Sequence, residues 1–171
     1  MRAAPFCLHR WAELKAQPGR HMSCPGLCSE LQTAYSAIPE FVALVGYPLP
    51  EKCEQASQKG LWMASFSDSS ANPYVAFAAA YDRDGGFYLW LLGVRPDARG
   101  AGLSRDLVNC FLSEGKRRGH TKFTALVHSG APGMAHVLEA AGFTVRGGAL
   151  KTAEVRGVVS VRTYSRYELR L

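Results

Sequence analysis

The segment from Arg99 to Arg105 holds the residues of this chain whose types and spacing are best suited to chemistry. It reads Arg-Gly-Ala-Gly-Leu-Ser-Arg, with two glycines between two arginines. Gly100 and Gly102 have no side chain to keep an anion away from the backbone, and flanking arginines can pair with phosphate oxygens. If a helix begins here, its first amides are unpaired and add further donors. The pattern predicts a phosphate-binding loop; an ordinary glycine-rich loop is the alternative.

The residues on both sides of this loop have the patterns of a buried strand and an amphipathic helix. Phe87–Val94 is a continuous apolar run without a charge, as in a strand buried on both faces. Pro96 ends that strand, because proline has no N–H for a ladder hydrogen bond. A helix is predicted from near Gly102 by apolar residues at helical spacing: Leu103, Leu107, Val108, Phe111 and Leu112. The loop lacks the Gly-Lys-Ser/Thr of a P-loop and the third glycine of a dinucleotide loop.

The segment Leu92–Leu103 resembles the acyl-coenzyme A signature of the GCN5-related N-acetyltransferase (GNAT) superfamily. That signature has Arg or Gln, two residues, Gly, one residue and then Gly or Ala, after a valine and a proline. Ser104 stands at the last of these positions. Further along the chain, Ala141–Phe143 matches the family's recurrent Leu-Gly-Phe. The resemblance implies an α+β fold with a mixed sheet, in which a mostly antiparallel sheet contains one splayed parallel pair and is flanked by helices.

The resemblance also implies how the chain would bind acetyl-CoA or another acyl-CoA. Two parallel strands, here Phe87–Val94 and Phe123–Val127, splay apart, and the pantetheine arm lies in the gap. A bulge expected at Gly93 would free backbone groups to pair with pantetheine and to stabilise an oxyanion. The implied cofactor-binding residues are Leu92, Gly93, Val94, Arg99, Gly100, Ala101, Gly102, Leu103, Ser104 and Arg105.

The side chains that often act as acid and base in this family are absent from the matching positions. Leu138 replaces the usual tyrosine acid, and the central strand contains no carboxylate. Residues of suitable chemistry are His128, His136, Tyr88, Tyr164 and Tyr167. We predict His128 as the base, because it ends the strand beside the splay and imidazole titrates near neutrality, with Tyr88 as the second catalytic residue. A solvent-facing strand end is the alternative for His128.

The acceptor side of the site is predicted from the segment Ser29–Leu49. Its apolar face is broken by Pro39, which predicts two short helices that meet there. In the family this region covers the acceptor pocket, so the implied substrate contacts are Tyr35, Phe41 and Tyr47. The alternative is that these aromatic residues belong to the core.

The remaining elements follow from local patterns. Leu61–Phe66 and Tyr74–Tyr81 are separated by turn residues and should form an antiparallel meander that ends in the central strand. A helix should begin near Pro132 and end at Gly142. The other predicted segments are a first strand at Phe6–Trp11, a short helix from Pro48 to Gln58, closing strands at Phe143–Val145 and Val158–Leu171, and a loop or hairpin at Gly147–Gly157.

Composition points to one intracellular domain that spans residues 1–171. The chain has 171 residues, of which 47% are hydrophobic, enough for one substantial core. It has no apolar run of membrane-spanning length and no secretory signal pattern, so we expect a cytoplasmic protein without a membrane partner, although Met22 could be an alternative start. Five cysteines, an odd number, favour reduced thiols. His21, Cys24 and Cys28 lack a fourth ligand at zinc-site spacing, so no metal is predicted.

The predicted function is N-acyl transfer from acetyl-CoA to a primary amine by direct attack in a ternary complex. The acceptor would be a small molecule or the amine of a protein or peptide. The net charge of +6 is more than coenzyme A requires, and arginines of the closing hairpin could favour an acidic acceptor or tRNA. Alternatives are therefore a transferase that uses an aminoacyl-tRNA donor and a catalytically silent CoA-binding or interaction domain. The apolar closing strands would suit a homodimer.

Overall fold

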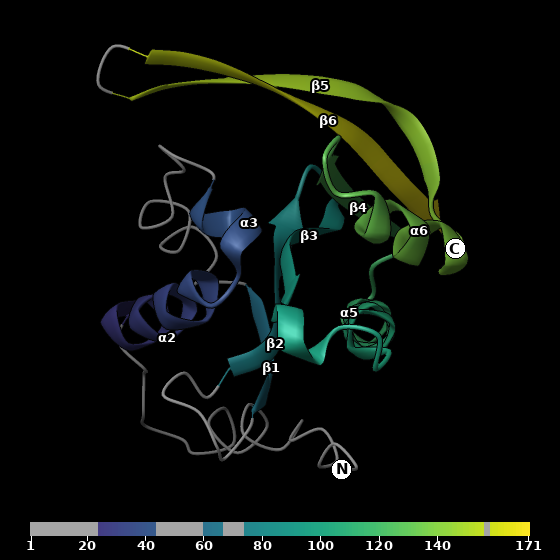
Figure 1. The fold of residues 1–171 in the computed structure, drawn as a ribbon. Helices are drawn as coiled ribbons and strands as arrows, with labels where there is room; N and C mark the ends of the chain where they lie inside the picture. The colour runs from purple at the N-terminus through teal and green to yellow at the C-terminus, as the bar shows by residue number, and fades with distance from the viewer. Residues whose placement is uncertain (1–23, 44–59, 67–73, 156–157) are drawn as a thin grey trace.

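A computed structural model describes residues 24–43, 60–66, 74–155 and 158–171 of the chain (Figure 1). The segments Phe6–Trp11 and Pro48–Gln58 lie outside the described residues, so their predicted elements stay predictions. The elements are, in chain order, α2 (Cys24–Ser36), α3 (Pro39–Val42), β1 (Leu61–Phe66), β2 (Tyr74–Arg83), β3 (Gly86–Val94), η1 (Pro96–Ala98), α5 (Leu103–Arg117), β4 (Lys122–His128), α6 (Pro132–Ala140), β5 (Thr144–Val155) and β6 (Val158–Arg170).

The strands form one mixed sheet in the order β1-β2-β3-β4-β6-β5. Only β3 and β4 pair in parallel among the described strands, and the other neighbours are antiparallel. Strands β1, β2 and β3 make the predicted meander, and the turn between β2 and β3 contains Asp84 and Gly85 with positive φ. The predicted α+β fold with a splayed parallel pair is confirmed.

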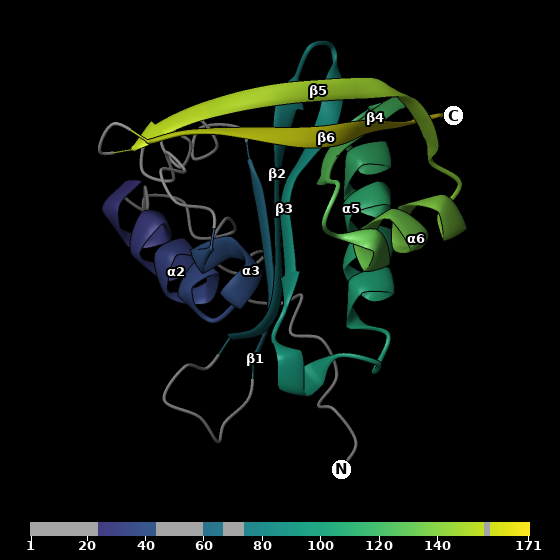
Figure 2. The ribbon, with the colours of Figure 1, turned by 45° about the horizontal axis from the view of Figure 1, so that its top comes forward.

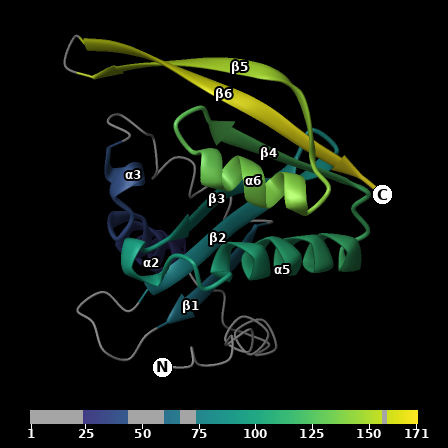
Figure 3. The ribbon, with the colours of Figure 1, turned by 45° about the vertical axis from the view of Figure 1, so that its right-hand side comes forward.

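Helices cover both faces of this sheet. In Figure 2, α2 and α3 lie on one side of β2 and β3, and α5 and α6 lie on the other. Figure 3 shows α5 and α6 along the same side of the sheet. Helices α2 and α3 meet at Pro39, as predicted, because proline at the first position of α3 cannot continue the preceding helix.

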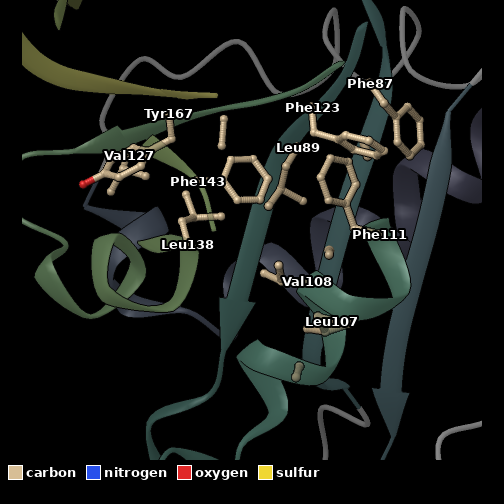
Figure 4. Close-up of a cluster of buried hydrophobic side chains, with 14 of the residues drawn as sticks. Phe87, Leu89, Leu107, Val108, Phe111, Phe123, Val127, Leu138, Phe143 and Tyr167 are labelled. Carbon is tan, nitrogen blue, oxygen red and sulfur yellow. The ribbon is translucent and has the colours of Figure 1, made fainter. Parts of the chain in front are cut away.

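The main core lies between β3, β4 and helix α5. Figure 4 shows the apolar side chains of α5 pointing at those of the two strands. The ring of Phe111 stacks on Phe87 with centroids 5.0 Å apart and meets Phe123 edge-on at 5.5 Å. All three rings are fully buried. Burial of this size fixes α5, and with it the loop that precedes the helix.

The closing hairpin is longer than predicted. The segment Gly147–Val155, predicted as a loop or hairpin, is part of strand β5, which pairs with β6 along its whole length. The glycines that suggested a turn lie at a bulge between Val145 and Gly147, and Gly147 has a φ of +135°. The hairpin reaches beyond β4 across the side of the molecule where α2 and α3 lie (Figures 1 and 2).

Candidate active site

Strands β3 and β4 separate halfway along their length. They are paired at Phe87, Tyr88 and Leu89 of β3, and no pairing between them is found beyond Leu89 in the described chain. The last residues of β4 pair with β6 on its other edge. The edge of β3 from Trp90 to Val94 that faces β4 therefore has no strand partner, and its peptide groups are available to a ligand.

The bulge that accompanies this separation is at Trp90. The position expected from the sequence was Gly93. Leu89 pairs with Ala80 and Leu91 with Ala79, so Trp90 is the extra residue of β3. Gly93 is paired regularly with Phe77. A glycine is needed at this position for another reason. A Cβ there would lie 2.8 Å from Phe41 Cε2 and 2.9 Å from Ile38 Cγ1, which is too close. Gly93 lets the junction of α2 and α3 pack directly on β3.

The predicted phosphate loop connects β3 to α5. Gly100 and Gly102 both have a φ of +83°, which glycine adopts readily, and a Cβ at either position would meet no atom within 4 Å. Gly102 is the N-cap of α5, and no side chain caps this helix end. The amides of Leu103 and Ser104, in the first turn of this 15-residue helix, therefore have no partner within the helix and no side-chain cap. Ala101 and Arg105 are exposed, whereas the Leu103 side chain is buried in the core.

Arg99 ties this loop to the acceptor side of the site. Its Nε donates to the carbonyl oxygen of Val94 at 3.2 Å, and its Nη2 lies 2.8 Å from both carboxylate oxygens of Glu40 in α3. The backbone amide and Arg99 hold the pKa of the Glu40 carboxyl below its ordinary value. Nearly half of the Arg99 side chain is exposed, so it can also reach an anion at the loop.

A cleft of about 140 Å³ opens where the two strands separate. On the α6 side its wall is apolar and consists of Ala131, Met134 and Leu138. On the α2 side and along the hairpin its wall contains Phe41, Tyr88, Trp90, His128, Lys151 and Tyr164. Leu92 contributes to the same lining. One half of the cleft is therefore apolar and suited to an alkyl arm, and the other half carries hydrogen-bonding and aromatic groups.

His128 lies at the end of β4 and lines this cleft. Its Nδ1 accepts a hydrogen bond from the Gly130 amide at 3.1 Å, and its ring meets Tyr164 edge-on with centroids 5.4 Å apart. Because Nδ1 accepts, the proton of the neutral ring is on Nε2. In this arrangement the Nε2–H is the group that can hydrogen-bond a ligand; the predicted role of His128 as a base needs the other tautomer and stays a prediction.

Tyr88 is almost fully buried between β2 and the cleft. Its ring contacts Tyr81 edge-on at 5.3 Å, and the Arg83 guanidinium carbon lies 5.0 Å from its centroid. Burial raises the pKa of the Tyr88 hydroxyl far above its ordinary value. The hydroxyl is therefore protonated at neutral pH and can donate a hydrogen bond, but it cannot serve as a base.

Of the other three catalytic candidates, one lines the cleft and two lie outside its described lining. Tyr164 lines the cleft opposite His128, and Lys151 Nζ lies 5.3 Å from the centre of its ring. Tyr167 packs into the core under α6, and its hydroxyl donates to Glu139 Oε1 at 3.0 Å. His136 is exposed on α6.

The predicted acceptor contacts are also divided. Phe41 lines the cleft, and its ring stacks on Tyr35 with centroids 5.0 Å apart. Tyr35 is buried behind it, its hydroxyl donates to the Phe41 carbonyl at 2.9 Å, and burial raises its pKa to about 12. Tyr35 therefore holds α3 in place instead of lining the described cleft. Tyr47 lies outside the described residues.

Cysteine and metal chemistry have little support at this site. Among the described residues, no group of three His, Cys, Asp or Glu side chains is placed to hold a metal ion. Cys110, on α5, is away from the described cleft lining, and burial raises the pKa of its thiol.

No helix in the described ranges is long and apolar enough to cross a membrane.

Comparison with known proteins places this arrangement in a family. The profile of the Acetyltransferase (GNAT) family matches residues 28–143, which is more than half of the chain. The chain belongs to the GNAT family. The family match includes β3, the glycine loop, α5 and β4, so it covers both the separated strands and the uncapped helix end. A comparison with curated proteins found no match.

Solved structures share the fold of this GNAT protein. The ribosomal-protein-S18-alanine N-acetyltransferase from Escherichia coli matches with a TM-score of 0.63 and 17% identity, over 83% of this chain and 88% of that one. An IAA acetyltransferase from Bacillus cereus matches with 0.59 and 16%, over 80% and 95%. A GNAT family acetyltransferase from Elizabethkingia anophelis with acetyl-CoA bound matches with 0.57 and 14%, over 78% and 91%. At such low identities the similarity shows the fold alone.

Several residues of the cleft in this GNAT protein were missed by sequence reasoning. Trp90 was recognised only as part of a buried strand, and Lys151 was assigned to a loop or hairpin with no role in the site. Ala131 and Met134 carried no chemical signal at all. The alternating buried and half-buried residues of β4 could have indicated that His128 and Leu126 share one face, since β-strand side chains alternate.

Proposed function

We propose that this GNAT protein is an N-acetyltransferase that transfers an acetyl group from acetyl-CoA to a primary amine within a ternary complex. One observation carries the proposal: the cleft between β3 and β4 opens beside an uncapped helix whose first turn is preceded by two glycines. The acyl arm and the phosphates of coenzyme A need these two environments side by side. The relative from Elizabethkingia anophelis with acetyl-CoA bound supports the choice of donor.

The proposed contacts to the co-substrate follow from the geometry. The amides of Leu103 and Ser104, together with Arg99 and Arg105, would bind the pyrophosphate. The unpaired edge of β3, including Leu92, would hydrogen-bond the pantetheine amides as an added strand, and Ala131, Met134 and Leu138 would cover its alkyl part. The bound thioester supplies an acetyl group to the amine nitrogen, and the coenzyme A thiol leaves.

The polar residues of the cleft would support the leaving group and the acceptor. Breaking the thioester leaves a thiolate that must take up a proton, while the attacking amine loses one. The Nε2–H of His128 would hydrogen-bond to the sulfur and stabilise the leaving thiolate, which then takes its proton from water, because Leu138 occupies the position of the family's usual tyrosine acid. Tyr88 would orient the acceptor through its neutral hydroxyl. The proton of the amine would leave through water.

The His128→Phe variant tests this role, with His128→Gln as the control. Phenylalanine keeps a flat ring but has no N–H donor, so we expect kcat to fall by about 10-fold while the KM for acetyl-CoA stays within about two-fold. Glutamine keeps an N–H donor and should lose less. Steady-state rates of thiol release at varied acetyl-CoA concentrations measure both constants. An unchanged kcat in His128→Phe would remove His128 from the chemistry.

The activity itself is tested by thiol release from acetyl-CoA in the presence of a panel of primary amines. A parallel reaction with aminoacyl-tRNA and the same amines tests the alternative donor. We expect amine-dependent thiol release with acetyl-CoA and no transfer from tRNA. Transfer from tRNA alone would replace the donor, and binding of acetyl-CoA without turnover of any amine would favour the silent CoA-binding domain.

A further inference from the structure

One face of β4 and β6 borders the acyl cleft and is open at its charged end, where Arg166 and Arg170 are exposed. The buried residues of β4, Phe123, Ala125 and Val127, point into the core under α5 and α6. Because side chains alternate along a strand, the opposite face carries Lys122, Thr124, Leu126 and His128. Their antiparallel partners on β6 point to the same side: Arg170, Glu168, Arg166 and Tyr164. We call these eight residues the open face.

A second pocket of about 60 Å³ on this face adjoins the acyl cleft. The pocket and the cleft share Tyr88, Ala125 and Leu126 as lining residues. The remaining lining of the pocket is polar and consists of Arg83, Asp84, Lys122, Thr124, Arg166 and Glu168. A molecule whose amine enters the cleft near His128 would therefore extend naturally into this polar pocket.

The charges of the polar pocket are balanced except at Arg166 and Lys122. Glu168 receives a hydrogen bond from Arg170 at 2.6 Å, and Asp84 pairs with Arg83 at 3.2 Å. Lys122 Nζ donates to the Asp84 carbonyl at 3.2 Å. Arg166 is exposed and makes no hydrogen bond or ion pair with the described part of the chain. Both carboxylates already have an arginine partner, so the pocket presents Arg166 and Lys122 to a ligand.

The cleft itself selects against cationic acceptors. Its described lining contains Lys151 and His128 but no Asp or Glu. The neighbouring walls are aromatic and come from Phe41, Tyr88, Trp90 and Tyr164. A polycationic acceptor would meet Lys151 and no carboxylate in the described lining to balance its charge, whereas an aromatic body would pack on the four rings.

We propose that the acceptor of this enzyme is a small primary amine with an aromatic or apolar body and an anionic group, a carboxylate or a phosphate, that binds at Arg166. The inference rests on the proposed acetyltransferase activity. Arg166 is the strand partner of Leu126, which lies two residues before His128, and the pocket extends to Thr124, four residues before His128. At about 3.3 Å per strand residue, the amine and the anion should therefore be roughly 7–13 Å apart. Arginine pairs with both kinds of anion through two parallel hydrogen bonds.

Two matched pairs of probe amines test this assignment. Para-(aminomethyl)benzoate is compared with para-(aminomethyl)benzamide, and para-(aminomethyl)phenyl phosphate with para-(aminomethyl)phenol. Calorimetry measures their binding to the protein saturated with coenzyme A, so no turnover is needed. We expect the anionic member of at least one pair to bind about ten-fold or more tightly than its neutral partner, and the better pair identifies the anion.

The Arg166→Gln variant then assigns the preference to a residue. We expect it to abolish the preference for the anion while leaving binding of the neutral probes and of coenzyme A unchanged. Arg117→Gln is the control, because it removes the same charge from an exposed site on α5 that is outside both described pocket linings. Equal binding of anionic and neutral probes, no binding of any probe, or a preference that survives in Arg166→Gln would overturn the inference. Failure of coenzyme A to bind would instead contradict the proposed activity on which it rests.

Discussion

At the scale of single residues, the decisive feature is that two arginines beside the cofactor loop, Arg95 and Arg99, already have carboxylate partners. Arg95 pairs with Asp97, and Arg99 pairs with Glu40 across the gap between the loop and α3. An incoming phosphate must therefore compete for Arg99 with a carboxylate. Substitutions of Arg99 and of Glu40 should therefore have different effects on cofactor binding, since only Arg99 would attract the phosphate.

Substitutions of Arg99 and Glu40 should act in opposite directions on the cofactor. Arg99→Gln removes a charge-assisted hydrogen bond to phosphate, so acetyl-CoA should bind about ten-fold more weakly. Glu40→Gln releases the guanidinium, so binding should tighten by about two-fold or stay the same. Calorimetric titration measures both. If Arg99 served only to hold α3, the two variants would remove the same contact and weaken binding alike.

Glu114 on α5 provides a pH-dependent stabilisation away from the site. Hydrogen bonds from Arg117 at 2.7 Å and Arg118 at 2.8 Å lower the pKa of Glu114 from 4.5 to about 2. The carboxylate therefore stabilises the fold above its unfolded pKa, and this contribution is lost as the pH falls from 4.5 to about 2. Solvent screens these pairs, so we expect Glu114→Gln to cost about 1 kcal/mol at pH 7. Urea unfolding should show a difference at neutral pH that disappears near pH 2, and a constant difference would contradict the ion pairs.

At the scale of elements, the site depends on how closely α3 approaches β3. Gly93 permits this approach, Phe41 from α3 forms one wall of the cleft, and Tyr35 fixes α3 from behind. The acceptor side is thus attached to the same strand that would bind pantetheine. Packing between α3 and β3 should therefore influence stability and acceptor binding together.

The Gly93→Ala variant tests this packing. A methyl group would overlap Phe41 and Ile38, so we expect the free energy of unfolding to fall by about 1–2 kcal/mol in urea denaturation. Gly133→Ala is the control, because a Cβ in this part of α6 meets nothing within 4 Å and alanine favours a helix. It should leave stability unchanged or raise it. If Gly93→Ala were as stable as the parent protein, the close contact would not constrain α3.

Much of the element pattern could be predicted from sequence, because local signals and tertiary packing agree there. Pro96, the two loop glycines and the apolar face of α5 specify the strand, the loop and the helix in order. The bulge at Trp90 could not be predicted, since it depends on how β2 and β3 align across the sheet. The segment with the glycines of β5 could be assigned only to a loop or hairpin, because its pairing with β6 is a long-range property.

At the scale of the whole molecule, two halves of a site come together from segments far apart in the chain. The proposed cofactor half comes from β3, the glycine loop and α6, and the proposed acceptor half comes from α3, the open face and the β5–β6 hairpin. The proposed acceptor could not be predicted from sequence, because it depends on Arg166 in the polar pocket and Lys151 in the cleft, which only the folded hairpin brings there. The sequence shows their charge but not their place.

The measurement that tests the central claim most directly is native mass spectrometry of the protein with acetyl-CoA. We predict one bound acetyl-CoA per chain, with clearly reduced occupancy in Gly102→Val, because valine at a φ of +83° is strained and places a side chain where the phosphates would lie. Circular dichroism of the variant shows whether it is folded. A folded parent protein that binds no acetyl-CoA would contradict the account, and so would a folded Gly102→Val protein with undiminished occupancy.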